Sequence, residues 1–316
     1  MSGAGKRLPG TPEPMRWWTG PTGLRIAGDQ WGDPAGPLVI LLHGGGQTRH
    51  AWKGAGEWLG RAGYHAVSFD ARGHGDSDWA PDGIYSQDVM VADLQCVVQA
   101  LGRRPTLVGA SMGGGTSMAA VGEDHVDATA LVLVDIAPRI EMEGVANINA
   151  FMGRNPNGFA SLEEVADAVA SYQPHRQRPK DISGLGKNVR QGEDGRLRWH
   201  WDPAFLHAAR HYANRTERLV ACARKLDLPV LLVRGGLSDL LSEAGARDFL
   251  TLCPHAEYVS VTDAHHMVAG DRNDIFLGAV SRCLERVVPV KGEPVKAPHE
   301  LHPRHLGPPG DVNDVP

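Results

Sequence analysis

The stretch that decides the fold is LVGASMGGG, residues 107–115, in which one serine stands among small residues directly after an apolar run. Residues 109–113 follow the pattern G-x-S-x-G, which is typical of a sharp turn that joins a strand to a helix and exposes a nucleophilic serine. Small residues suit such a turn because bulkier ones would collide with the neighbouring backbone. They also suit plain packing of a helix on a strand. The pattern therefore predicts a nucleophile at Ser111 only if other segments supply its chemical partners.

Short apolar runs alternate with helical patterns on both sides of this turn. The runs are rich in Val, Leu and Ile, as parallel strands are when both faces of their sheet are covered. These runs are 37–44, 65–73, 105–111, 130–138, 229–236 and 256–264, and residues 22–32 alternate like an antiparallel strand. Helical patterns cover 52–63, 85–102 and 274–287. The alternation predicts an α/β fold with a mostly parallel, doubly wound sheet.

One long segment interrupts this alternation. Residues 139–213 contain helical pieces such as SLEEVADAVASY and a Trp-rich stretch, RLRWHWDP, but no convincing parallel strand. Because structureless connections longer than about 15 residues are uncommon, we expect an inserted helical cap here. The expected organisation is a flexible N-terminus (1–14), a core (15–138 and 214–290), the helical cap (139–213) and a tail rich in Pro and His (291–316).

A serine nucleophile needs a base, and the base needs an acid to orient it. In this class of fold the chain order is serine, acid, histidine. Asp239 follows the expected strand at 229–236, and His266 follows the next one. We therefore expect Ser111, Asp239 and His266 to form the catalytic set. Asp135 also ends a strand and is the alternative acid.

The glycine-rich loop LLHGGGQTRHAW, residues 41–52, follows another expected strand. Its backbone amides can stabilise a developing oxyanion, and we expect Gly45 and Met112 to donate, with Gly46 as the alternative to Gly45. A plain glycine-rich turn is the other interpretation of this loop. We expect the substrate pocket to be lined by apolar side chains of this loop and of the cap. The residues assigned to it are Gly46, Trp52, Phe151, Trp199 and Trp201.

The stretch DARGHGDSD, residues 70–78, places three aspartates and a histidine within a short distance in sequence. Such a cluster could bind a metal ion or form a structural turn. The other histidines are scattered without metal-ligand spacing. No metal and no cofactor are expected.

Taken together, these motifs resemble those of capped α/β hydrolases, in the branch that holds haloperoxidase-like esterases and epoxide hydrolases. The resemblance spans about residues 24–290, and its motifs are 43–45, 70–78, the turn at Ser111 and 238–271. It implies that 70–78 is a structural turn in which Arg72 and the glycines hold loops near the active site, and not a metal site. Relatives usually have a Gly-His pair before MVAGD, whereas this chain has His265 and His266. His266 keeps the register with Met267, and we expect it to be the working imidazole.

The resemblance implies a serine hydrolase that cleaves a small or medium carboxylic ester through an acyl-enzyme on Ser111. The same residues could transfer the acyl group to another acceptor, as in an acyltransferase or perhydrolase, or cleave a carbon–carbon bond. A serine at the turn argues against epoxide hydrolase and dehalogenase chemistry, which uses an aspartate in similar folds. A ligand-binding receptor without turnover is the alternative from another class.

The composition is that of an ordinary globular chain, with 316 residues, 42% hydrophobic residues and a net charge of −5. This charge indicates no basic face for nucleic acid. The N-terminus lacks the apolar region of a signal peptide, and no later stretch is apolar enough to span a membrane. We therefore expect a cytoplasmic protein without nucleic-acid or membrane partners that acts on a small-molecule ester. No feature of the sequence indicates an oligomeric state.

Overall fold

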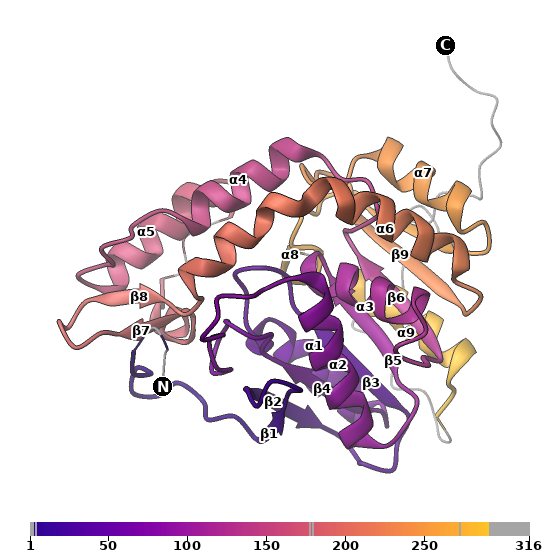
Figure 1. Ribbon diagram of the computed structural model, residues 1–316, viewed down its shortest axis with the longest axis horizontal. Coiled ribbons are helices and arrows are strands. Elements are labelled where there is room, and N and C mark those ends of the chain that lie inside the picture. The colour runs from indigo at the N-terminus through magenta and orange to yellow at the C-terminus, as the bar shows by residue number, and fades with distance from the viewer. Residues whose placement is uncertain (1–2, 4, 177, 179, 272, 291–316) are drawn as a thin grey trace.

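One eight-stranded sheet organises the computed structural model (Figure 1), which describes residues 3, 5–176, 178, 180–271 and 273–290. The strand order is β1-β2-β4-β3-β5-β6-β9-β10. β1 pairs with β2, and β2 with β4, in antiparallel fashion, and all other neighbours are parallel. The strands are β1 (Arg16–Thr19), β2 (Arg25–Trp31), β3 (Leu38–Leu42), β4 (His65–Phe69), β5 (Thr106–Ala110), β6 (Ala130–Val134), β9 (Val230–Gly235) and β10 (Glu257–Val261). This confirms the predicted α/β fold, and each predicted strand run contains one of these strands.

Helices cover both faces of the sheet because successive strand residues point to opposite sides. Ile40 and Leu42 of β3 pack into the core beneath α2, α3, α6 and α7, whereas Val39 and Leu41 pack into the core beneath α1 and α9. The bounds are α1 (Lys53–Arg61), α2 (Gln87–Leu101), α3 (Met112–Gly122), α6 (Tyr212–Lys225), α7 (Glu243–Leu252), α8 (Val268–Asp271) and α9 (Asn273–Val287), and the short helix η1 (Arg49–Trp52) precedes α1. Burial on both sides explains why the strands read as continuous apolar runs.

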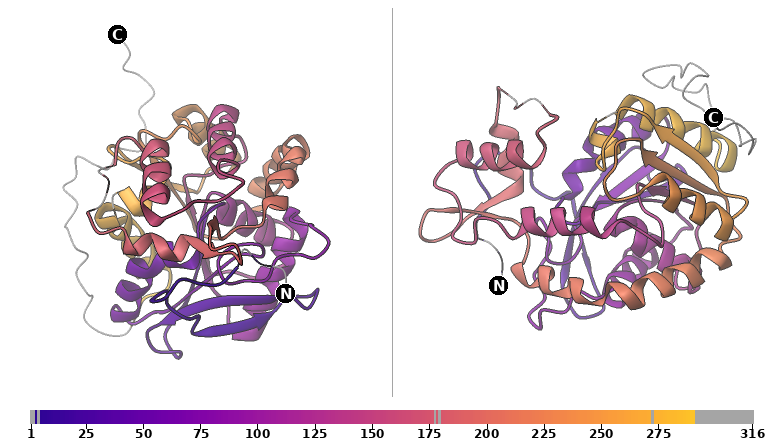
Figure 2. Two further views of the ribbon diagram at one scale, coloured as in Figure 1. Left: turned by 90° about the vertical axis from the view of Figure 1, so that its left-hand side faces the viewer. Right: turned by 90° about the horizontal axis from the view of Figure 1, so that it is seen from above.

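The segment between β6 and β9 begins with elements that gather at one side of the core (Figures 1 and 2). They are α4 (Met142–Met152), α5 (Leu162–Tyr172), η2 (Ser183–Asn188), β7 (Val189–Gln191), β8 (Leu197–Trp199) and η3 (Pro203–His211). The segment expected to be a helical cap also contains two short strands, β7 and β8, which form an antiparallel hairpin that the sequence analysis did not predict. The physical reason is an alternation with period two, in which Leu197, Trp199 and Trp201 are buried between polar neighbours.

The N-terminal residues contact this same region. Lys6 forms a β-bridge with Gln191, and Leu8 packs against a buried cluster that includes Phe159 and Trp199. The Pro12 carbonyl accepts a hydrogen bond from Arg49 of η1, in the core. The sequence pattern of residues 1–14, which we expected to be flexible, does not predict these contacts. The expected tail, 291–316, lies outside the described residues.

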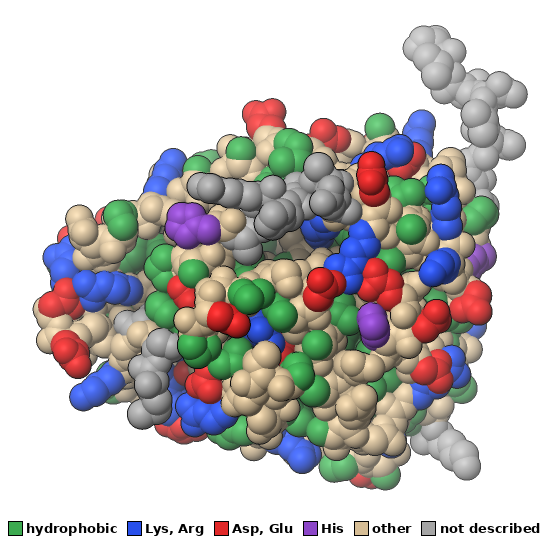
Figure 3. Space-filling model, viewed as in Figure 1, with side chains coloured by type: hydrophobic (Ala, Val, Ile, Leu, Met, Phe, Trp, Pro, Cys, Tyr) green, Lys and Arg blue, Asp and Glu red, His purple; other side chains and the backbone are tan. Residues whose placement is uncertain are grey.

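Acidic and basic side chains are interspersed on the face of the molecule shown in Figure 3. Opposite charges therefore lie close to one another on this face, in keeping with the modest net charge of −5. Among the helices of the described residues, none has both the length and the apolar character needed to cross a membrane.

Candidate active site

Ser111 stands at the turn between β5 and α3, with a backbone φ of 47° and ψ of −111°. Residues other than glycine rarely adopt a positive φ, so this turn is strained. Glycines on either side permit it. A Cβ on Gly109 would lie 2.6 Å from the carbonyl carbon of Gly113, and a Cβ on Gly113 would lie 2.5 Å from the carbonyl oxygen of Leu42. Ser111 thus lines a cavity at the N-terminal end of α3, where the helix dipole favours negative charge.

His266 is held by a fully buried carboxylate, that of Asp135, at the end of β6. The Nδ1 atom of His266 lies 2.6 Å from Asp135 Oδ2. The same carboxylate accepts hydrogen bonds from the Ser238 hydroxyl, at 2.5 Å, and from the Gly235 amide, at 2.9 Å. Because an ionised carboxylate only accepts hydrogen bonds, the Nδ1 atom carries the proton, and Nε2 of the neutral ring can take another.

The structure does not bring Asp239 to His266, which corrects the expected acid. The Asp239 carboxylate instead accepts a hydrogen bond of 3.4 Å from Asn147 of α4. The physical reason lies in the turn after β9, where Ser238 points back to Asp135 and its hydroxyl accepts the Leu240 and Leu241 amides. Sequence reasoning missed Ser238, although it directly precedes Asp239.

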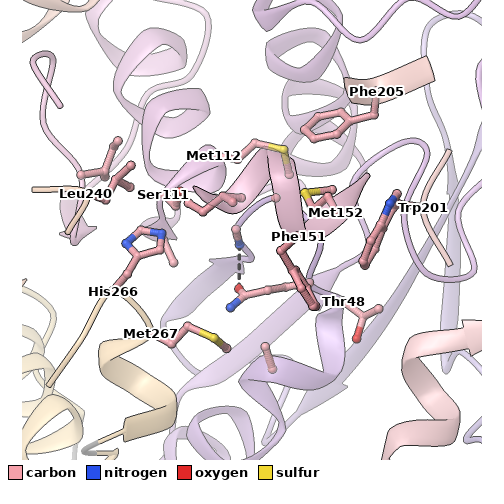
Figure 4. Close-up of a pocket in the computed structure, with 18 of the residues that line it drawn as sticks. Thr48, Ser111, Met112, Phe151, Met152, Trp201, Phe205, Leu240, His266 and Met267 are labelled. Carbon is pink, nitrogen blue, oxygen red and sulfur yellow. Dashed lines mark hydrogen bonds between the residues drawn. The ribbon is translucent and has the colours of Figure 1, made fainter. Parts of the chain in front are cut away.

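His266 and Ser111 line one end of the same cavity together with Met112 (Figure 4). In the described structure no hydrogen bond joins the Ser111 hydroxyl to His266. Catalytic hydrogen bonds often tighten only when substrate binds. His265 lies elsewhere, with its ring stacked on that of His175 at 3.6 Å between centroids. The geometry therefore agrees with the preference for His266 over His265.

The glycine loop after β3 lies directly beside Ser111, since a Cβ on Gly44 would be 3.3 Å from the serine Cβ. The Gly44 amide donates to the Gln47 side chain, and the Gly46 amide donates to His74. Among the described residues, neither the Gly45 amide nor the Met112 amide has a hydrogen-bond acceptor. These two amides are thus available for a ligand oxygen, whereas the alternative donor, Gly46, is already engaged.

Three buried imidazoles hold this loop in place. His43 Nδ1 donates to the Gly44 carbonyl and its Nε2 accepts from the Ala71 amide. His74 Nε2 accepts from the Gly46 amide, at 3.1 Å. His200, from the cap, accepts from the Gly75 amide, at 2.8 Å, and donates to the Gly46 carbonyl, at 3.3 Å.

All three imidazoles need to be neutral to serve as acceptors. Burial lowers the pKa of His43 to about 4 and that of His74 to about 3. Burial also lowers the pKa of His200 well below its ordinary value. The rings therefore stay uncharged at neutral pH. The sequence analysis assigned no role to His200. The only sequence feature that pointed to this histidine was its position in the Trp-rich stretch.

The cavity has a volume of about 700 Å³ and is lined both by residues at the ends of the sheet strands and by residues of the segment 139–213. All of the expected pocket residues line it, namely Gly46, Trp52, Phe151, Trp199 and Trp201. Figure 4 shows Phe151, Met152, Trp201 and Phe205 across from Ser111 and His266. The aromatic residues also pack on one another, as Trp199 and Trp201 stack with centroids 4.9 Å apart. They therefore both build the cap and form a wall of the cavity.

The aspartates of residues 70–78 form ion pairs and hydrogen bonds within the protein. Asp70 and Asp76 both pair with the buried Arg49, at 2.6 and 2.9 Å. Asp76 also pairs with Arg190 of β7, at 2.8 Å, and so ties the cap to the core. Arg72 pairs with Asp93 of α2, at 2.6 Å. These contacts support the interpretation of 70–78 as a structural turn. Among the described residues no group of His, Cys, Asp or Glu is arranged to hold a metal ion.

Three features at the ends of the sheet strands define an α/β hydrolase. They are a strained serine between β5 and α3, an imidazole held by a buried carboxylate, and a glycine loop beside the serine. The chain matches the family described as serine aminopeptidase, S33, over residues 33–273, and it belongs to that family. The predicted family resemblance is therefore confirmed, and the protein is a hydrolase.

Similar proteins agree with this class. Esterase Rv0045c of Mycobacterium tuberculosis is 29% identical over 269 residues, which cover 82% of this chain and 86% of the esterase. The 3-hydroxybutyrate-oligomer hydrolase of Cupriavidus necator is 29% identical over 266 residues, covering 78% of this chain and 88% of that protein. The crystal structure of E-2-(acetamidomethylene)succinate hydrolase has a TM-score of 0.75 at 24% identity, covering 85% and 98% of the two chains, and it supports the fold.

Proposed function

We propose that the protein hydrolyses a small or medium carboxylic ester through an acyl-enzyme on Ser111. His266 acts as general base and then as general acid, and Asp135 orients its ring. The amides of Gly45 and Met112 bind the oxyanion. The observation that carries this proposal is the 2.6 Å contact between His266 Nδ1 and a fully buried Asp135, at the end of the cavity lined by Ser111.

In the proposed reaction, Ser111 Oγ attacks the ester carbonyl carbon while His266 Nε2 takes the hydroxyl proton. The carbonyl oxygen becomes an oxyanion that receives two amide hydrogen bonds, of which each is worth about 3 kcal/mol of barrier. His266 then gives its proton to the departing alcohol. A water molecule, activated by the same imidazole, attacks the acyl-enzyme and releases the acid and free Ser111.

Two further observations support an ester of modest size. The relatives include a protein named esterase and one named for the hydrolysis of 3-hydroxybutyrate oligomers. Cap side chains lie over the glycine loop, because a Cβ on Gly46 would lie 3.1 Å from the Met152 sulfur and one on Gly45 3.6 Å from the Phe205 ring. Side chains this close to the glycine loop leave room for a small or medium acyl group, whereas a long chain would need an open groove. We retain residues 139–213 as the proposed cap.

The test combines active-site labelling with a series of p-nitrophenyl esters from acetate to palmitate. We expect a fluorophosphonate to label the wild type at Ser111 and hydrolysis to be fastest with short or medium acyl groups. Ser111→Ala should lose labelling and lower kcat by several orders of magnitude, because triad losses are that large. Thermal unfolding of the variant serves as the control for folding.

Other outcomes would lead to a different function. A wild type that binds the esters without labelling or turnover would be the non-catalytic receptor. Preference for emulsified long-chain triglycerides would contradict the proposed pocket. Faster consumption of the ester when an alcohol or peroxide is added, with formation of the transfer product, would favour the acyltransferase or perhydrolase.

A further inference from the structure

The charged side chains that line the cavity are predominantly basic. They are Asp88, Arg176, Lys187, Arg215 and Arg218, in addition to His266. Asp88 pairs with Arg218 at 2.6 Å, and Arg218 also forms a bidentate pair with Glu123. Asp88, the one carboxylate among the described lining residues, is thus already engaged in an ion pair. A cavity with this balance of charges favours an anionic ligand over a cationic one.

Lys187 differs from Arg218 because no carboxylate of the described residues forms an ion pair with its ammonium group. It lies at the end of η2 in the cap and is partly buried. Burial, followed by repulsion from nearby Lys53, lowers its pKa. An ammonium group that is withdrawn from water without a counterion is costly, and a bound anion would remove much of that cost.

The position of Lys187 indicates where such an anion would bind. Burial lowers the pKa of His50 in η1, and the nearby charges of Arg49 and Lys187 lower it further, so Lys187 lies on the η1 side of the cavity. Thr48 lines the cavity at this end, and Figure 4 shows it well separated from Ser111 and His266, with Phe151 between them. Asn188, which follows Lys187, also lines the cavity and offers an amide. The anion would therefore lie several bonds away from the reacting carbonyl.

We propose that Lys187 is a specificity-determining residue, and that the natural substrate is an ester that carries a carboxylate at the end remote from the scissile bond. This inference rests on the proposed ester hydrolysis and adds the charge of the substrate. One ammonium group, with the neutral side chains of Thr48 and Asn188 also lining the cavity, matches the single charge of a carboxylate. A phosphate ester or phosphate group, with its higher charge, is the alternative source of the anion.

The probes are p-nitrophenyl monoesters of adipate and suberate, compared with the same esters whose far carboxylate is replaced by a carboxamide. A second pair, p-acetoxybenzoate and p-acetoxybenzamide, places the charge on the alcohol side. A p-nitrophenyl acyl ester ending in a phosphate monoester tests the other anion. In the wild type we expect kcat/KM to be about tenfold higher for the carboxylate than for the carboxamide in at least one pair, through a lower KM.

Lys187→Met should remove this preference, whereas Lys187→Glu should reverse the preference toward an ester with a terminal ammonium group. Lys53→Met is the matched control, because Lys53 is 63% exposed, pairs with Glu57 and does not line the cavity. It should keep the preference. Thermal unfolding of each variant shows whether it is folded.

Two kinds of failure can be told apart. If the wild type turns over neither member of any pair and resists the fluorophosphonate, the proposed ester hydrolysis is wrong. If neutral esters are cleaved but no pair shows a preference for the carboxylate, the proposed substrate charge is wrong and ester hydrolysis stands. If Lys187→Met retains the preference, the role of Lys187 is wrong. If the enzyme prefers the phosphate probe to the carboxylate esters, the charged group of the substrate is a phosphate and not a carboxylate.

Discussion

At the scale of single residues, two carboxylates follow neighbouring strands, and it is Asp135 that contacts His266. Asp135 and Asp239 follow β6 and β9, which are neighbours in the sheet. Asp135 has a φ of 51°, and its amide donates to the Val233 carbonyl at 2.7 Å, so its side chain is held at the sheet end facing His266. The turn after β9 presents Ser238 to Asp135, while Asp239 faces Asn147.

The first prediction at this scale compares Asp135→Asn with Asp239→Asn. We expect kcat to fall by about 10⁴-fold in Asp135→Asn, the size of loss found for this change in serine proteases, because the amide cannot fix the Nδ1–H tautomer. Asp239→Asn is the matched control and should stay within about twofold of the wild type. Steady-state kinetics with one p-nitrophenyl ester measure both. A larger loss in Asp239→Asn would restore the acid inferred from the sequence.

At the scale of elements, the cap does more than cover the cavity. The stretch after β8 carries His200, which bonds to Gly75 and to Gly46. Arg190 of β7 pairs with Asp76, and its other hydrogen bonds go to the Lys187 and Val189 carbonyls. His200 thus bonds directly to a glycine of the loop that carries the Gly45 amide, whereas Arg190 joins the cap to the core through Asp76. We infer that His200 is a positioning residue for the proposed oxyanion site.

This role can be tested with His200→Leu and with Arg190→Met as the matched control. We expect His200→Leu to lower kcat by about 10- to 100-fold with little change in KM, since displacing a catalytic group by about an ångström has effects of that size. Arg190→Met should reduce stability and leave kcat within about twofold. His200→Gln, which retains a donor and an acceptor, should recover part of the rate. Equal loss of kcat in the Leu and Arg190 variants would show that attachment of the cap, and not the loop position, matters.

At the scale of the whole molecule, several histidines are buried in the neutral form. Burial lowers the pKa of His43 and His50 to about 4 and that of His74 to about 3, and it lowers the pKa of His200 as well. In the unfolded chain each would titrate near pH 6.5. Below that pH the unfolded state therefore binds more protons than the folded state, and acid favours unfolding.

The resulting prediction concerns the free energy of unfolding as a function of pH. It should change little above about pH 7.5, where these groups are neutral in both states, and fall between about pH 6.5 and 4. Each buried histidine contributes a slope of about 1.4 kcal/mol per pH unit within this window. Urea unfolding at several pH values measures the slope. His200→Gln should reduce the slope by the contribution of one histidine, because one fewer proton is bound on unfolding. A free energy that stays constant or rises on acidification would contradict the neutral histidine cluster.

The sequence by itself determined the sheet and the turn at Ser111, and it favoured His266 over His265. Each depends on a local pattern: apolar runs buried on two faces, glycines at positions where a Cβ would collide, and the register of His266 with Met267. The β7–β8 hairpin was missed because only three residues form each of its strands, and their alternation was read as part of a helical cap.

Only the tertiary structure decided which carboxylate meets His266, how the glycine loop is held and which cation faces the cavity. Asp135 lies 131 positions from His266 in sequence, and His200 lies 154 positions from Gly46. Such contacts depend on the direction in which a side chain leaves the end of its strand or loop, and spacing along the chain does not encode that direction. Asp239 had the expected place in chain order, but the turn after β9 directs Ser238 to the site instead.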